Sequence, residues 1–189
     1  MILIADTLQK HSLNSGIIQF PYQVDSGSVA RLIDELNYLN TKEPLLSEIT
    51  LYIMSEGGDA YAGLGAYDML RQSVLPVTGI VVGYAASAAV MILLQGCRQR
   101  HAMPNARLLF HEARTFLGTA EEGHSQRRLS DGASELSIVQ DQVDQILVER
   151  TGRSLEDVQT LCTSRDVWLS AQEALQWNII DRIVGGPRC

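Results

Sequence analysis

The chain has 189 residues, a formal net charge of −7 and a sequence pI near 5.0. Nucleic acids and anionic membrane surfaces bind basic protein faces, so this acidic balance argues against both as partners. The longest apolar run is too short to span a membrane, and the N-terminus lacks the basic region of a signal peptide. The three cysteines lack metal-ligand spacing, which predicts a cytoplasmic protein with reduced thiols and no metal. The length suits a single domain over residues 1–189.

Strands alternate with helices in the hydrophobic pattern of the first part of the chain. The apolar runs predict strands at 16–20, 49–54, 77–82, 98–103 and 107–110. Asp25 or Ser26 caps a helix after the first strand, and Gly57-Gly58 is predicted as a tight turn before a second helix. This alternation predicts an α/β fold with a mainly parallel sheet.

The pattern changes after residue 114, where a polar segment precedes a long helix from about Ser134 to Arg150. Such a helix either projects from the molecule and serves assembly or packs on the core, and the sequence leaves both open. The other elements expected here are a helix opened by Ser154, a strand at 167–169, a helix with a Ser170–Glu173 capping box and a strand at 179–184.

Ser87 is the candidate nucleophile because it lies where a buried strand gives way to a buried helix, within Gly83-Tyr84-Ala85-Ala86-Ser87-Ala88. A serine at the first turn of a helix lies beside free main-chain N–H groups and the positive end of the helix dipole. Its small neighbours would let a substrate backbone come close. The alternative is an ordinary N-cap, which is the commoner role of a serine at such a junction.

Further positions could complete an acyl-transfer site around this serine. Gly58 follows a strand and could direct its N–H, together with that of Ala88, at a developing oxyanion; the alternative is a plain turn. His111 emerges from a strand end, where a neutral imidazole could act as a general base. Asp166 precedes a strand and could orient that imidazole, or it could be a surface acid paired with Arg165.

Collinear motifs support the functional reading of these residues. They are LYIMSEGG at 51–58, AGLGAYD at 62–68, GYAAS at 83–87, AMPNAR at 102–107, TGRSL at 151–155 and RDVWLSAQEA at 165–174. In this order they resemble LYINSPGG, AGLAIYD, GxAAS, ALPNSR, TGQPL and RDxFxSAxEA of the Clp protease proteolytic subunit (ClpP) family. The resemblance covers nearly the whole chain from Ile17 onward.

The resemblance implies a ClpP/crotonase-like fold of stacked β–α units, with a projecting handle helix in the region of about residues 115–150. It implies a catalytic triad of Ser87, His111 and Asp166, and it implies no cofactor, since ATP would belong to a partner. It also implies a homo-oligomer, a heptameric ring or double ring, that degrades unfolded proteins or peptides delivered by an AAA+ unfoldase. Tyr52 matches a position of the docking pocket for that ATPase, and the alternative for Tyr52 is plain strand packing.

The chain also departs from the family pattern. Ala88 replaces a methionine, Ala113 replaces a proline, the segment from His111 to Asp166 is several residues longer, and the N-terminal segment, 1–15, is shorter. These departures predict a divergent member and keep a catalytically inactive structural subunit open as an alternative. A crotonase-type acyl-CoA enzyme, which uses similar oxyanion donors, is a second alternative. A Ser–Lys peptidase is excluded because every lysine precedes the candidate serine.

Overall fold

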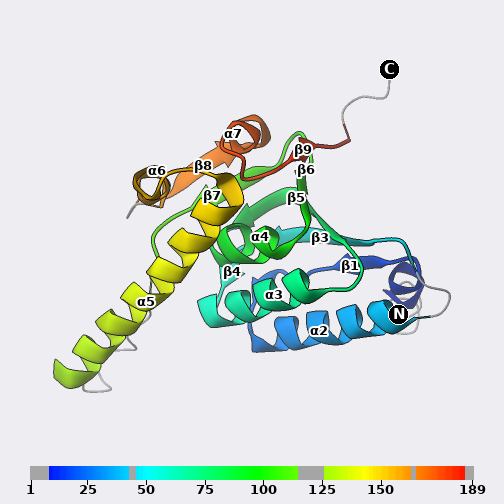
Figure 1. Ribbon diagram of the computed structural model, residues 1–189, viewed down its shortest axis with the longest axis horizontal. Coiled ribbons are helices and arrows are strands. Elements are labelled where there is room, and N and C mark those ends of the chain that lie inside the picture. Colours follow the sequence, from blue (N-terminus) through cyan, green and yellow to red (C-terminus); the bar gives the residue numbers. More distant parts are fainter. Residues whose placement is uncertain (1–8, 43–45, 115–125, 163–164, 186–189) are drawn as a thin grey trace.

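A mainly parallel sheet forms the centre of the protein (Figure 1). The computed structural model describes residues 9–42, 46–114, 126–162 and 165–185. Along the sheet the strands follow the order β1 (Ile17–Gln19), β3 (Ile49–Ser55), β5 (Val77–Ala86), β6 (Gln99–Ala102) and β9 (Arg182–Ile183). All of these neighbours pair in parallel, so the predicted α/β fold with a mainly parallel sheet is confirmed.

Strand β5 is the longest of the described strands, and its two halves have different partners. Its first half pairs with β6 through Thr78–Val81, and its last residues, Tyr84–Ala86, pair with β7 (Arg107–Phe110). Gly83, between the halves, has a φ of +72°, a left-handed value that favours glycine and lets the strand change direction. Strand β8 (Val167–Ser170) then pairs with β7 in the antiparallel sense.

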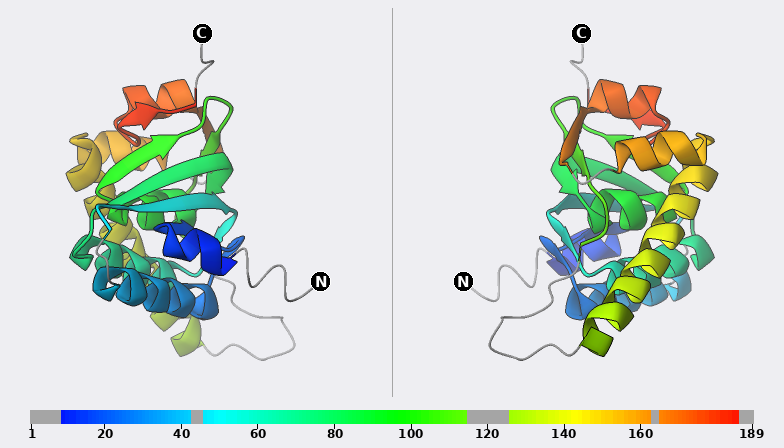
Figure 2. Two further views of the ribbon diagram at one scale, coloured as in Figure 1. Left: turned by 90° about the vertical axis from the view of Figure 1, so that its right-hand side faces the viewer. Right: turned by 90° about the vertical axis from the view of Figure 1, so that its left-hand side faces the viewer.

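Helices lie on both sides of this sheet, and the helices next to the candidate site lie on one of them. In the left view of Figure 2 the central strands face the viewer, and α4 (Leu94–Gly96) and α5 (Gln126–Thr151) lie behind them. Helix α2 (Ser26–Thr41) begins at the predicted cap, Asp25, whose side chain accepts a hydrogen bond from the Ser28 amide, and α3 (Ala60–Gln72) is capped by Asp59. The predicted buried helix after Ser87 is confirmed, although it opens with a π-helical turn, η1 (Ala89–Leu93), before α4 (Leu94–Gly96).

The face of β3 and β5 that points away from α4 and α5 is less covered by other elements. Alternate residues of β3 are fully buried, whereas Tyr52 is half-buried and Met54 is exposed. In the register, Tyr52 lies opposite Ile80 of β5, which is also only partly buried. This face therefore carries an apolar surface made by these three side chains.

Helix α5 (Gln126–Thr151) both packs on the core and extends beyond it. Its C-terminal half contributes buried Val139, Val143 and Leu147 and contacts α6 (Leu155–Leu161), whereas its first turns extend past the neighbouring elements (Figure 1). It begins before the predicted start at Ser134, because Gly132 is tolerated inside the helix. The rest of the predicted handle, residues 115–125, and residues 1–8 of the N-terminal segment lie outside the described residues.

Two local predictions need correction. Gly57–Gly58 is not a tight turn but a short strand, β4, paired in parallel with β2 (Gln23–Val24). The strand expected at 179–184 is reduced to β9, because the amides of Ile179 and Ile180 donate to the Ala174 carbonyl at the end of the preceding helix. The capping box predicted at the start of α7 (Ala171–Gln176) is confirmed, with Ser170 and Glu173 as its partners.

Within the described residues, no helix is both long and apolar enough to cross a membrane.

Candidate active site

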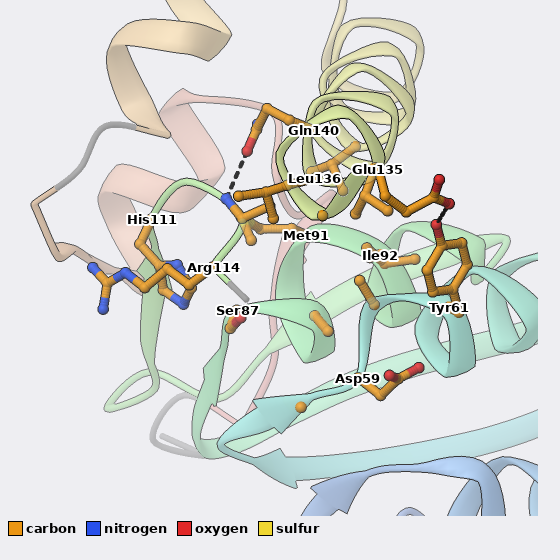
Figure 3. Close-up of a pocket in the computed structure, with 17 residues that line it drawn as sticks. Asp59, Tyr61, Ser87, Met91, Ile92, His111, Arg114, Glu135, Leu136 and Gln140 are labelled. Carbon is orange, nitrogen blue, oxygen red and sulfur yellow. Dashed lines mark hydrogen bonds between the residues drawn. The ribbon is translucent and has the colours of Figure 1, made fainter. Parts of the chain in front are cut away.

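A cavity of about 370 Å³ opens beside the first turn of η1, between the β-strand ends and helix α5 (Figure 3). Gly58, Ser87, Ala88 and His111 all line it, so these predicted residues meet in one place although they come from separate segments of the chain. The parallel pairing of β5 with β7 brings Ser87 and His111 together, because each follows one of these neighbouring strands. Strand β4, from a separate two-stranded sheet, passes against the turn after β5 and adds Gly58. Asp166 is not among the residues that line the cavity.

Ser87 occupies a strained backbone position between β5 and η1. Its φ is +53°, and Asn178 is the other described residue with a side chain that has a left-handed φ. Such a conformation costs about 1–2 kcal/mol for a residue with a Cβ atom. The position is held by the Ser87 amide, which donates to the Leu109 carbonyl at 3.0 Å, and by the Ser87 carbonyl, which accepts from Met91 at 2.9 Å.

Ser87 is not the N-cap residue of the helix that follows it. The N-cap position of η1 falls on Ala88, which has no side-chain capping hydrogen bond. Ser87 is only partly buried, and its side chain lies at the cavity (Figure 3). A strained residue that exposes its hydroxyl to a cavity is typical of a nucleophile.

The glycine pair of β4 passes against the turn that carries Ser87. A Cβ atom added to Gly57 would lie 2.5 Å from the Ala86 carbonyl oxygen and 2.8 Å from the Ser87 Cβ, and the Gly57 φ is +90°. A Cβ atom added to Gly58 would collide with the Val24 carbonyl oxygen. Gly57 is therefore required for β4 to approach this turn, and Gly58 for β4 to pair with β2. The approach brings Gly57 beside the Ala88 amide.

His111 follows directly on β7 and is partly exposed at the cavity. Its Nδ1 lies within hydrogen-bond distance of the Glu112 carbonyl oxygen. None of the hydrogen bonds among the described residues joins His111 to Ser87 or to Asp166. The structure thus brings the predicted base to the predicted nucleophile's cavity without linking the two.

The main chain of Asp166 lies beside that of His111 in space, but the Asp166 carboxylate pairs with a different residue. The last pair of the antiparallel β7–β8 ladder is Phe110 and Val167, so His111 and Asp166 are the next residues on the two strands. The Asp166 Oδ1 nevertheless lies 2.8 Å from Nη2 of Arg114. The predicted alternative of a surface acid paired with an arginine therefore describes this conformation, although the structure gives Arg114 rather than Arg165 as that partner.

The walls of the cavity are apolar near the serine and acidic at the other end. The apolar side chains come from η1 and α5, namely Met91, Ile92, Leu136, Val139 and Val143. At the far end Tyr61 donates a hydrogen bond to Glu135, and this bond raises the pKa of Tyr61 (Figure 3). These wall residues belong to no motif, so the sequence does not indicate their place in the site, although the apolar periodicity of the long helix indicates a buried face there.

A serine in a strained turn, a glycine pair against it and a histidine in the same cavity are the arrangement that a hydrolase with a serine nucleophile requires. Comparison with known proteins identifies the family. The Clp protease family model matches residues 4–187, so the chain belongs to the Clp protease family.

Three relatives show how similar the chain is to individual members. It is 31% identical over 180 residues to the ATP-dependent Clp protease proteolytic subunit 3 of Streptomyces coelicolor, which is 95% of this chain and 80% of the relative. It is 33% identical to the ATP-dependent Clp protease proteolytic subunit of Leuconostoc citreum, over 94% of this chain and 86% of the relative. It is 34% identical to the ATP-dependent Clp protease proteolytic subunit 2 of Prochlorococcus marinus, over 87% of this chain and 80% of the relative. The predicted family and the prediction of a ClpP-type serine peptidase are thereby confirmed, whereas the triad stays a prediction.

Proposed function

We propose that this chain is an endopeptidase subunit in which Ser87, His111 and Asp166 act together as the catalytic triad. The observation that carries the proposal is that Ser87, held at a φ of +53°, shares one cavity with His111 and Gly58. Strained backbone at a cavity that also holds a general base is the arrangement expected of an activated nucleophile.

In the proposed reaction the Ser87 Oγ attacks the carbonyl carbon of a peptide bond. His111 takes the serine proton and returns it to the leaving amine, and Asp166 accepts a hydrogen bond from the imidazole and stabilises its charged form. Water then repeats the same steps on the acyl-enzyme. The negative oxygen formed in each half-reaction is held by the amides of Gly58 and Ala88, and one such donor typically contributes about 3–4 kcal/mol to transition-state stabilisation.

A side-chain rearrangement would join the histidine to the acid of the proposed triad. Because the β7–β8 ladder ends at Phe110 and Val167, the main chains of His111 and Asp166 are already neighbours. His111 has to turn its Nδ1 from the Glu112 carbonyl to the carboxylate, and Asp166 has to leave Arg114. Catalytic hydrogen bonds are often absent or long in a resting enzyme and tighten when substrate binds.

The cavity also indicates which substrate side chain the site accepts. Met91, Ile92, Leu136 and Val139 form apolar walls next to Ser87. Burying a large apolar side chain there would contribute about 1.5–3 kcal/mol to binding. We therefore expect cleavage after apolar residues of unfolded polypeptides.

We further propose that the chain forms a homo-oligomeric ring or double ring and receives substrates from an AAA+ unfoldase. The names of the relatives, which call them subunits of an ATP-dependent protease, support this assembly and the ATPase partner. Tyr52, with Met54 and Ile80, provides an apolar surface on the open side of the sheet for docking that partner. Cys97 and Cys162 are buried free thiols, which fits a cytoplasmic protein.

The test is labelling of the purified oligomer with a fluorophosphonate probe, together with hydrolysis of a fluorogenic peptide. Wild type and the control Ser137→Ala, at an exposed position outside the cavity, should both be labelled and active. Ser87→Ala should be neither labelled nor active. Equal labelling of Ser87→Ala and wild type would reject the triad, and a wild type without labelling or hydrolysis would favour the inactive structural subunit.

A further inference from the structure

The ion pair between Arg114 and Asp166 occupies the carboxylate that the proposed triad requires. Arg114 lies three residues after His111 on the same segment, and both residues line the Ser87 cavity. Its guanidinium Nη2 is 2.8 Å from Asp166 Oδ1, so it makes a charge-assisted hydrogen bond to that oxygen. One short segment thus presents two possible partners, Arg114 and His111, to a single acid.

We propose that Arg114 is a positioning residue that holds Asp166 away from His111 in the resting protein. Activation then exchanges the arginine–carboxylate pair for the imidazole–carboxylate hydrogen bond. The inference rests on the proposed triad, because it concerns how often that triad is assembled.

A hydrogen bond ties the main chain of this segment to α5, so the proposed exchange takes place through side chains. The Ala113 amide donates a hydrogen bond to Gln140 Oε1 of α5 at 2.6 Å (Figure 3), and Gln140 Nε2 donates to Asp144 Oδ1 at 2.6 Å. Asp144 is 2% exposed, which anchors Gln140 against the core. His111 and Arg114 on either side of this anchor keep their places, and Asp166 changes partner by rotation.

The exposure of the Arg114–Asp166 pair determines how strongly it restrains Asp166 and how that restraint responds to salt. The Arg114 and Asp166 side chains are 52% and 51% exposed, and exposed ion pairs of this kind shift an equilibrium by about two- to fivefold. The same exposure makes the pair sensitive to dissolved salt, which screens charges in contact with solvent. The restraint is therefore weak and reversible, and salt relieves it.

The experiment compares Arg114→Gln, which loses the charge, with Arg114→Lys, which keeps it, in the assembled protein. A matched control is Arg71→Gln, which removes a similarly exposed arginine from an ion pair with Glu149, outside the cavity. The measurements are kcat and KM for a fluorogenic peptide and the rate of probe labelling, each at low salt and at about 0.5 M NaCl.

We expect Arg114→Gln to raise kcat about two- to fivefold at low salt and to show little further response to salt. Wild type, Arg114→Lys and Arg71→Gln should start lower and become faster as salt is added. A role of Arg114 in substrate binding alone would change KM and leave kcat at saturating substrate unaltered.

Two results would overturn the proposal. One is an Arg114→Gln variant with the kcat and salt response of wild type, or with a lower kcat. The other is a gain from Arg114→Gln that persists in the Asp166→Asn background, because the effect would then not pass through Asp166. Failure of the triad itself is distinguishable, since Ser87→Ala would then be labelled as wild type is. If Arg114→Gln does not assemble, the wild-type protein alone still tests the proposal, because a wild-type kcat that does not change with salt would overturn it.

Discussion

Replacing Gly57 by alanine tests whether the close approach of β4 to the serine turn matters for catalysis. The added Cβ would lie 2.5 Å from the Ala86 carbonyl oxygen and 2.8 Å from the Ser87 Cβ, at a φ of +90°. The left-handed backbone costs about 1–2 kcal/mol for alanine, and overpacking typically costs about 1–3 kcal/mol. We therefore expect Gly57→Ala to lower the free energy of unfolding by about 2–5 kcal/mol.

Gly57→Ala should also lower the activity of the molecules that still fold and assemble. Both clashing groups belong to the turn that sets the Ser87 hydroxyl and the Ala88 amide, so relief of the clash must move one or both. A displacement approaching 1 Å at reacting groups costs about 100-fold in rate. We expect kcat/KM per assembled molecule to fall by about that factor, as measured by peptide hydrolysis after purification of the assembled fraction.

The matched control is Gly65→Ala in α3, where an added Cβ meets nothing within 4 Å. This change removes the flexibility of a helical glycine and should raise the free energy of unfolding by about 0.5–1 kcal/mol without changing kcat/KM. A Gly57→Ala variant with wild-type activity and wild-type thermal stability would refute the reasoning. It would mean that β4 does not constrain the serine turn.

Two further predictions concern substrate preference and acid stability. Leu136→Ala should lower kcat/KM about three- to tenfold for peptides with a large apolar residue before the cleaved bond, because it removes part of the cavity wall; Ile138→Ala, outside the cavity, should not. Burial alone would raise the pKa of Asp181, but hydrogen bonds from Arg100 lower it below its usual value. This carboxylate therefore stabilises the fold above its usual pKa of 3.8, and the contribution disappears as the pH falls through the lowered value. Urea titrations across that range should show a weaker loss of stability in Asp181→Asn than in wild type.

The sequence was a good guide wherever the chain's own periodicity decides the structure. The strands at β1, β3, β6, β7 and β8 and the helices α2, α3, α6 and α7 lie close to their predicted places, because each follows from local alternation, spacing or a capping residue. The β4 strand was missed because it exists only through pairing with Gln23–Val24, two residues that are far away in the sequence. A two-residue pairing leaves no periodic signal.

The contrast between local patterns and long-range contacts also applies to the candidate site. Ser87, Gly58 and His111 were found from motifs and from their places at strand ends, and the cavity gathers them. The left-handed φ of Ser87 was not foreseen, because it depends on hydrogen bonds to Leu109 and Met91 in the folded protein. The Arg114–Asp166 pair spans 52 residues and depends on the β7–β8 register, so no local pattern indicates it.

The attachment of each site residue to the sheet explains why Asp166, the proposed acid of the triad, lacks a hydrogen bond to His111. The serine turn continues β5, whose last residues pair with both β3 and β7, and His111 continues β7, which pairs with β5. Asp166 precedes β8, which has β7 as its one neighbour in the described sheet. A strand held along one edge opens locally at a lower free energy than strands inside a sheet. The proposed nucleophile and base therefore follow strands inside the sheet, whereas the alignment of the proposed acid would depend on an edge strand and on the competing side chain of Arg114.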